Sequence, residues 1–149
     1  MSERLPNPEQ DCAIGFEGGN LLVSAAAGSG KTSTLTARVL RKLLNEENPI
    51  DIDRMLIVTF TRAAASQMKD KISTELSKVK TSRANRQQIL LPTAQICTID
   101  AFGLWLIRQY GSTIGLPVNV SLSPEERVKL LEEQTLSAYI AEKFDSNDE

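Results

Sequence analysis

Histidine is absent from this sequence of 149 residues, and cysteine occurs only at Cys12 and Cys97. Zinc sites draw most of their ligands from these two residue types, usually in closely spaced pairs. With no histidine and two isolated cysteines, we exclude a zinc site. Two reduced thiols are typical of a protein of the cytoplasm, which is the location that we expect.

The sequence also lacks a long apolar run. Apolar residues make up 41% of the chain, which is enough for a core. No run approaches the roughly 20 residues that cross a bilayer. Residues 1–4 do not have the basic and then apolar order of a secretory signal. We therefore expect no membrane partner, and one domain or one domain plus the start of another.

Residues 21–32 have the pattern of a buried strand, a glycine-rich turn and the start of a helix, which a phosphate-binding loop requires. Glycines let backbone N–H groups approach phosphate oxygens, and the helix N-terminus directs its dipole at the same anion. Lys31 is expected to reach the β- and γ-phosphates, and the Thr32 hydroxyl to ligate Mg2+. The predicted nucleotide-binding residues of the loop are Ala25, Ala26, Ala27, Gly28, Ser29, Gly30, Lys31 and Thr32. Ala25 stands where such loops usually begin with glycine, and the alternative is an ordinary turn between a strand and a helix.

Charge is distributed unevenly along a chain whose net charge is −2. Residues 62–86 hold seven basic and two acidic side chains, whereas residues 123–149 hold three basic and eight acidic ones. The basic stretch is compatible with a surface that contacts the phosphates of a nucleic acid. A solvated helix face would give the same pattern, so charge alone leaves both interpretations open.

Hydrophobic periodicity predicts strands that alternate with helices, which implies a parallel sheet with helices on both faces. The predicted strands are residues 21–24, 53–60 and 94–98, with an edge strand at 118–122. The predicted helices begin after Asn7, at Lys31, after Thr61, after residue 98 and after Ser123, and the last runs to about Phe144. One stripe of the helix after Thr61 is expected in the core: Ala64, Met68, Ile72, Leu76 and Val79. Polar residues 81–88 are expected to be a connection.

Four short motifs in fixed order resemble one family. They are residues 7–10 (Asn-Pro-Glu-Gln), the loop at 25–32, residues 58–68 (beginning Val-Thr-Phe-Thr-Arg) and residues 98–102 (Thr-Ile-Asp-Ala-Phe). Together they resemble the N-terminal part of superfamily 1 DNA helicases of the UvrD/RecB type, most of all the AddA (RexA) subunits of bacterial helicase–nucleases. The resemblance implies an α/β fold, a RecA-like P-loop NTPase parallel sheet with flanking helices, incomplete and followed by the start of a helical subdomain. The implied boundaries are 1–122 for the ATP-binding domain (1A) and 123–149 for the helical insertion (1B).

The same resemblance assigns roles to individual residues. It implies that the Gln10 amide reads the adenine of ATP, although a helix-capping role alone would also explain Gln10. It implies that single-stranded DNA is contacted by Phe60, Thr61, Arg62, Thr98 and Phe102. For Phe60 a place in the core is the alternative, and Thr98 and Phe102 are equally open to one. Arg62 replaces the common asparagine and Asp100 the common histidine, so these positions depart from the family pattern.

The implied function is that of an ATP-dependent DNA helicase with exonuclease activity in double-strand break repair and recombination. Its cofactors would be ATP and Mg2+, its catalytic lysine Lys31, and its partners DNA and a second, AddB/RexB-like subunit. Hydrolysis also needs an Asp-Glu pair after an apolar strand. Asp148 and Glu149 follow no such strand, so we expect this chain to bind ATP without hydrolysing it. The alternatives are a stand-alone P-loop nucleotide-binding module or small nucleotide kinase without DNA, and a structural domain that binds no nucleotide.

Overall fold

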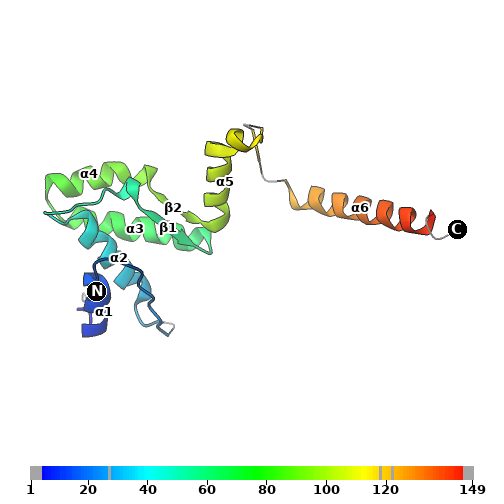
Figure 1. The fold of residues 1–149 in the computed structure, drawn as a ribbon. Helices are drawn as coiled ribbons and strands as arrows, with labels where there is room; N and C mark the ends of the chain where they lie inside the picture. The colour runs from blue at the N-terminus through cyan, green and yellow to red at the C-terminus, as the bar shows by residue number, and fades with distance from the viewer. Residues whose placement is uncertain (1–4, 27, 118, 122, 146–149) are drawn as a thin grey trace. The chain divides into compact units, whose positions relative to one another are not determined.

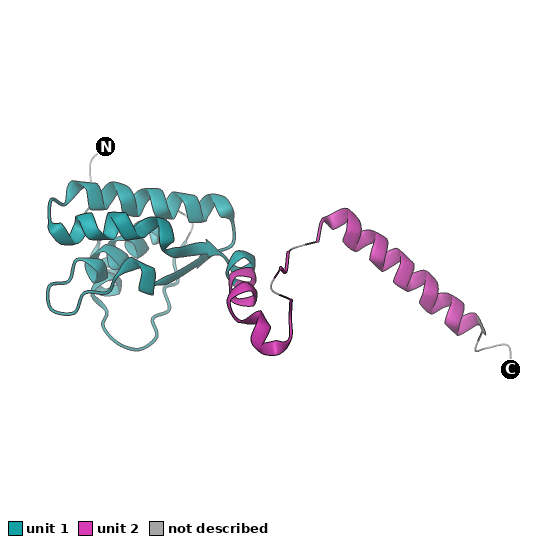
Figure 2. Cartoon of the chain, turned by 90° about the horizontal axis from the view of Figure 1, so that it is seen from above, with its two compact units in different colours: residues 1–102 teal, residues 103–149 magenta. Residues whose placement is uncertain are grey.

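The computed structural model describes residues 5–26, 28–117, 119–121 and 123–145. The chain divides into two compact units, Met1–Phe102 and Gly103–Glu149, coloured separately in Figure 2. The predicted domain boundary after residue 122 concerns a larger domain and stays a prediction. Within the described residues, no helix is long and apolar enough to cross a membrane.

The first unit consists mainly of helices around a small sheet (Figure 1). Its helices are α1 (Pro8–Gly15), α2 (Lys31–Leu43), α3 (Arg62–Lys78) and α4 (Ser82–Leu90), and its strands are β1 (Leu56–Thr59) and β2 (Gln95–Thr98). Short 3-10 turns, Ile52–Arg54 and Leu91–Thr93, precede the two strands. The strands pair in parallel, with Leu56 opposite Gln95 and Thr59 opposite Thr98. The predicted parallel arrangement of these two strands is therefore confirmed.

Helix α3 forms the centre of the core. It packs against β1, β2, α2 and α4. Its buried side chains are Ala65, Met68, Ile72 and Leu76, which recur at the spacing that places them on one face of a helix. Three of the five residues predicted for this stripe are thus buried, while Ala64 is exposed and Val79 is half-buried.

The predicted strand at residues 21–24 is wrong. These residues adopt no regular structure, and the side chains of Leu21, Leu22 and Val23 are 40%, 93% and 47% exposed. A strand is stable only when a neighbouring strand satisfies its backbone groups and its side chains are covered. In the described part of the chain the sheet consists of β1 and β2 alone, so this apolar segment has no neighbour.

Two further predictions need correction. Residues 81–88 belong to α4, whose N-cap Thr81 accepts a hydrogen bond from the backbone N–H of Ala84. The strand predicted from residue 53 begins only at Leu56, because residues 52–54 form a 3-10 turn. Leu56 and Val58 stay 49% and 39% exposed, so β1 is covered on one face rather than on both.

The second unit contains most of α5 (Ile99–Tyr110), the 3-10 turn Gly111–Ile114, and α6 (Glu125–Asp145). Both helices were predicted. The predicted edge strand at 118–122 includes Val118 and Leu122, which lie outside the described residues, and residues 119–121 form no strand. All the apolar side chains of α6 between Val128 and Phe144 are exposed within this chain.

Candidate nucleotide-binding loop and strand-end surface

The loop that leads into α2 has the backbone geometry of an anion-binding turn. Gly28 and Gly30 have φ angles of +76° and +88°, a region that side-chain-bearing residues rarely adopt. Gly30 is the N-cap of α2, and no side chain caps this helix end. The first N–H groups of α2 therefore lack side-chain acceptors and can bind an anion, which the helix dipole also favours. Ala27 lies outside the described residues.

Lys31 is bound to the loop that precedes it. Its Nζ donates hydrogen bonds to the backbone carbonyls of Ala25 and Ala26, at 2.5 and 2.7 Å. An ammonium group has three donors, so one remains for another acceptor. Both Lys31 and Thr32 are exposed. The predicted phosphate ligand is thus placed beside the turn, and the predicted Mg2+ ligand follows it in the first turn of α2.

Gln10 connects α1 to the same loop. Its Oε1 accepts a hydrogen bond from the backbone N–H of Asn7 at 2.9 Å, and the Asn7 side chain accepts from the Gln10 N–H at 2.8 Å. This is the predicted capping box. The Gln10 Nε2 also donates to the carbonyl of Ser29 at 3.0 Å. Each polar atom of the amide keeps one unused hydrogen-bonding capacity, and the two backbone partners fix which atom is oxygen and which is nitrogen.

Sequence reasoning missed Arg38, which joins α2 to the end of α1. Its Nη1 donates to the carbonyls of Ala13 and Phe16 at 2.8 and 2.7 Å, and to that of Ile14 at 3.4 Å. Its guanidinium also lies over the Phe16 ring, 5.8 Å from the centroid. No local signal distinguishes this arginine from the other basic residues of an amphipathic helix, because its partners are more than 20 positions away.

The predicted DNA-binding residues follow the ends of β1 and β2. Phe60 is 92% exposed and Arg62 is exposed, so both are accessible to a ligand. Thr61 caps α3 by accepting a hydrogen bond from the Ala64 N–H at 3.1 Å. Thr98 is 8% exposed, and its hydroxyl accepts from the Ala101 N–H at 3.2 Å. Phe102 is half-buried. The structure thus gives the first segment an open surface and commits the Thr98 hydroxyl to the start of α5.

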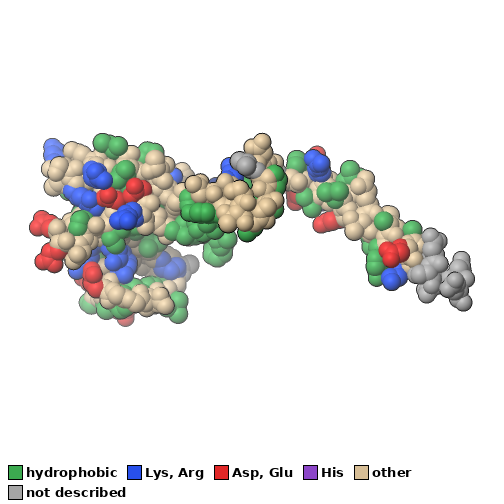
Figure 3. Space-filling model, turned by 45° about the horizontal axis from the view of Figure 1, so that its top comes forward, with side chains coloured by type: hydrophobic (Ala, Val, Ile, Leu, Met, Phe, Trp, Pro, Cys, Tyr) green, Lys and Arg blue, Asp and Glu red, His purple; other side chains and the backbone are tan. Residues whose placement is uncertain are grey.

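The basic stretch at residues 62–86 is partly neutralised by acidic residues. Arg83 and Arg86 both bind the Asp51 carboxylate, at 2.7 and 3.1 Å, and Lys78 binds Glu75 at 2.8 Å. Figure 3 accordingly shows lysine and arginine side chains next to acidic ones on the visible face of the first unit. The stretch is therefore not one continuous basic patch.

The Asp51 carboxylate lies at the centre of a polar network. Gln87 donates to its Oδ1 at 2.7 Å, and the Gln87 Oε1 accepts from the backbone N–H of Ile52 at 2.9 Å. Arg83 also donates through Nε to the carbonyl of Leu43 at 2.8 Å. The hydrogen bond from Gln87, followed by the contacts with the two arginines, holds the pKa of Asp51 below its usual value. This network joins the segment before β1 to α4.

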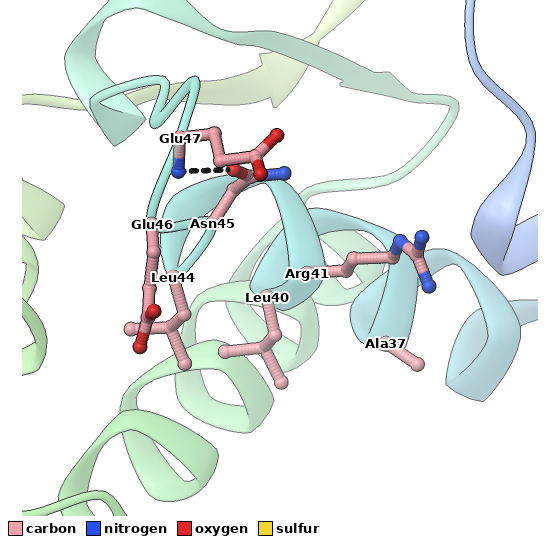
Figure 4. A pocket seen from close by; sticks show the side chains of 7 residues that line it. All are labelled: Ala37, Leu40, Arg41, Leu44, Asn45, Glu46 and Glu47. Atoms are coloured by element: carbon pink, nitrogen blue, oxygen red, sulfur yellow. Dashed lines mark hydrogen bonds between the residues drawn. The ribbon is translucent and has the colours of Figure 1, made fainter.

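A shallow hollow lies at the C-terminal end of α2 (Figure 4). It is lined by Ala37, Leu40, Arg41, Leu44, Asn45, Glu46 and Glu47. The Asn45 side chain accepts from the backbone N–H of Glu47 at 2.9 Å and so closes the turn after the helix. None of the predicted site residues lines this hollow. In the described residues, no group of three or more acidic, cysteine or histidine side chains could hold a metal ion by itself.

Comparison with known proteins gives a consistent result. Residues 6–149 match the family described as the UvrD/REP helicase N-terminal domain. The A-type subunit of the ATP-dependent helicase/nuclease of Bacillus cytotoxicus is 42% identical over 137 residues, which cover 89% of this chain and 11% of that protein. The protein of the same name from Carboxydothermus hydrogenoformans is 42% identical over 145 residues, 94% of this chain and 12% of the relative. The one from Lachnoclostridium phytofermentans is 40% identical over the whole chain and 11% of its own length. The chain thus spans about a ninth of the length of these relatives.

Proposed function

The chain belongs to the UvrD/REP helicase N-terminal domain family, and on that basis we propose that Gln10 and residues 25–32 bind ATP together with Mg2+. The family implies a RecA-like P-loop fold, of which the chain holds part. We assign residues 1–122 to the ATP-binding domain 1A and residues 123–149 to the start of the helical insertion 1B. We place the protein in the cytoplasm.

The observation that carries this proposal is the hydrogen bond between the Gln10 amide and the carbonyl of Ser29. It joins the predicted base-reading residue to the turn whose next two residues are Gly30 and Lys31. Gly30 opens the uncapped N-terminus of α2, and Lys31 has its ammonium group against the same turn. A reader of the base, an anion-binding helix end and a lysine cation are therefore assembled around one short loop.

Each group has a distinct role when nucleotide binds. The N–H groups at the start of α2 would donate to phosphate oxygens, and Lys31 would exchange its two carbonyl acceptors for the more negative β- and γ-phosphates. The hydroxyl of Thr32 would hold Mg2+, which neutralises phosphate charge. The free hydrogen-bonding capacities of Gln10 match the donor and acceptor on the exchangeable edge of adenine.

We further propose that the whole protein is an ATP-dependent DNA helicase and nuclease subunit that acts in double-strand break repair and recombination with a second subunit. The names of the relatives support this proposal. The share of this chain would be nucleotide binding and one wall of the DNA groove, formed by Phe60, Thr61 and Arg62 with Thr98 and Phe102. Since the sequence has no Asp-Glu pair after an apolar strand, the chain by itself would bind ATP with negligible turnover.

Titration of the purified chain with Mg-ATP, followed by an ATPase assay on the same sample, tests this function. We expect binding with negligible turnover, and single-stranded DNA binding that weakens steeply with salt. Absence of nucleotide binding would favour a purely structural domain. Nucleotide binding without any DNA binding would favour a stand-alone nucleotide-binding module, and rapid ATP hydrolysis would contradict the assignment as an ATP-binding segment without its catalytic half.

A further inference from the structure

Helix α1 is held in place by polar contacts rather than by a buried face. None of its side chains is buried in the described structure, and its apolar residues do not gather on one side. Most helices are fixed by the apolar face that they bury, so a helix without one depends on specific hydrogen bonds. For α1 these bonds are concentrated at two places, Gln10 near its start and Arg38 of α2 at its end.

Arg38 supplies what the end of α1 lacks. The last turn of a helix leaves carbonyls without intrahelical partners and carries a partial negative charge, which a cation stabilises. The last turn of α1 contains no basic residue of its own. The half-buried guanidinium of Arg38 binds the carbonyls of Ala13 and Phe16 there and covers the Phe16 ring. Arginine suits this place because its planar group can donate at its edge while its face covers an aromatic ring.

The position of Arg38 along α2 connects this anchor to the phosphate site. Lys31 and Arg38 are seven residues apart, which places them on nearly the same face, two turns and about 10 Å apart along the axis. One rigid helix therefore carries the predicted phosphate ligand at its start and the anchor of α1 two turns later. Gln10 belongs to α1, so the distance between the base-reading amide and the loop depends on this anchor.

We propose that Arg38 is a positioning residue that sets the base selectivity of the nucleotide site. By holding the end of α1 on α2, it keeps the Gln10 amide at a fixed place beside Ser29, where it can discriminate adenine from guanine. The inference rests on the proposed nucleotide binding, and it assigns Arg38 no contact with the nucleotide. Removal of Arg38 separates base reading from phosphate binding, because the loop, Gly30 and Lys31 stay attached to α2.

The test compares the affinities of the full chain for Mg-ATP, Mg-GTP and inorganic tripolyphosphate. We expect the wild type to prefer ATP over GTP, and Arg38→Met to lose this preference, with ATP affinity lower by about tenfold, the order of one hydrogen-bonded contact. Tripolyphosphate affinity should not change. Arg38→Lys keeps the charge and should restore part of the preference. Arg41→Met is the matched control, because Arg41 is an exposed arginine of the same helix without a hydrogen bond to a backbone carbonyl of α1 in the described structure.

Amide hydrogen exchange provides a second readout. In Arg38→Met we expect faster exchange in α1 and unchanged protection of α3, because the core around Met68 and Ile72 does not involve Arg38. Retention of the wild-type ATP preference in Arg38→Met would overturn the inference. Equal weakening of all three ligands, with loss of protection in α3, would also overturn it by showing a general structural role. A wild type that binds no triphosphate would instead refute the proposed function, and one that binds ATP and GTP equally would leave Arg38 no selectivity to set.

Discussion

Thr59 and Thr98 are register partners at the ends of two parallel strands. The chain therefore leaves β1 and β2 at the same edge of the sheet, and residues 60–62 and 99–102 begin side by side. Open α/β sheets bind their ligands at this carboxyl edge. The two segments differ, however, because Phe60 is almost fully exposed whereas Thr98 is buried and caps α5. We therefore expect the first segment to contribute more of the DNA contact.

Replacement of Phe60 tests that expectation. An exposed aromatic ring can stack on a nucleic acid base, and each such contact is worth about 1–3 kcal/mol. Phe60→Ala should lower the affinity for single-stranded DNA by about tenfold or more, measured by fluorescence anisotropy. Its melting temperature should stay unchanged, because the ring is 92% exposed. Ile89→Ala is the control, since Ile89 is a 78% exposed apolar residue of α4. A lower melting temperature with unchanged DNA affinity would show that Phe60 belongs to the core.

Replacement of Lys31 tests the phosphate site. A hydrogen bond to a charged group contributes about 1.5–3 kcal/mol, so Lys31→Ala should weaken Mg-ATP binding by roughly tenfold to a hundredfold. Calorimetric titration measures this change. The fold should tolerate the substitution, because the two carbonyls that Lys31 binds are on exposed residues. Lys71→Ala removes a charge from an exposed position of α3 and should leave ATP affinity as it is. Unchanged affinity in Lys31→Ala would exclude Lys31 as a phosphate ligand.

Local sequence patterns predicted the parts of the fold that local physics determines. The capping box of Asn7 and Gln10, the cap at Thr61 and the core stripe through Met68 depend on residues three or four positions apart, and all are confirmed. Helix α4 was missed because its buried residue Gln87 is polar, which interrupts the apolar period. Gln87 is buried because Asp51, 36 positions earlier, accepts a hydrogen bond from it.

The predicted strand at residues 21–24 failed for a different reason. Its apolar sequence is suited to a buried strand, but burial also needs a neighbouring strand, which periodicity within the segment cannot supply. The site shows the same limit. The loop with Gly30 and Lys31 was recognisable from the sequence, whereas Arg38 was not, because its carbonyl partners on α1 are brought near only by the packing of α1 on α2.

Replacement of Gly30 tests the geometry of the loop. Its φ angle is +88°, and a left-handed conformation costs a side-chain-bearing residue about 1–2 kcal/mol. A Cβ at this position would also lie 3.0 Å from the Gln10 Nε2 and displace the amide from Ser29. Gly30→Ala should therefore lower the free energy of unfolding by about 1–2 kcal/mol in urea titration, and also weaken ATP binding.

Gly103→Ala is the matched control for Gly30→Ala. Gly103 lies within α5, and nothing would be within 4 Å of an added Cβ. Alanine is favoured over glycine in helices by about 1 kcal/mol, so this substitution should be neutral or stabilising. Similar effects at both positions would contradict the left-handed geometry of the loop.

The network around Asp51 predicts a dependence of stability on pH. Hydrogen bonding from Gln87 and the nearby Arg83 and Arg86 lower the pKa of Asp51 in the folded state. A carboxyl group with a lowered folded pKa stabilises the protein above its unfolded pKa of about 3.9, and this contribution disappears as the pH falls through the folded pKa. The free energy of unfolding of Asp51→Asn should thus be lower than that of the wild type at pH 7, and the difference should shrink below about pH 4.

Urea titrations between pH 2 and pH 7, about the range in which carboxyl groups change charge, measure this difference. Asp53→Asn is the control, because Asp53 is two positions away, exposed, and in no ion pair within the described residues. It should follow the wild type at every pH. Since Asp51 joins the segment before β1 to α4, its loss should also increase amide exchange in α4 before exchange in α3 changes. A difference between Asp51→Asn and wild type that is constant with pH would show that the carboxylate charge does not stabilise this network.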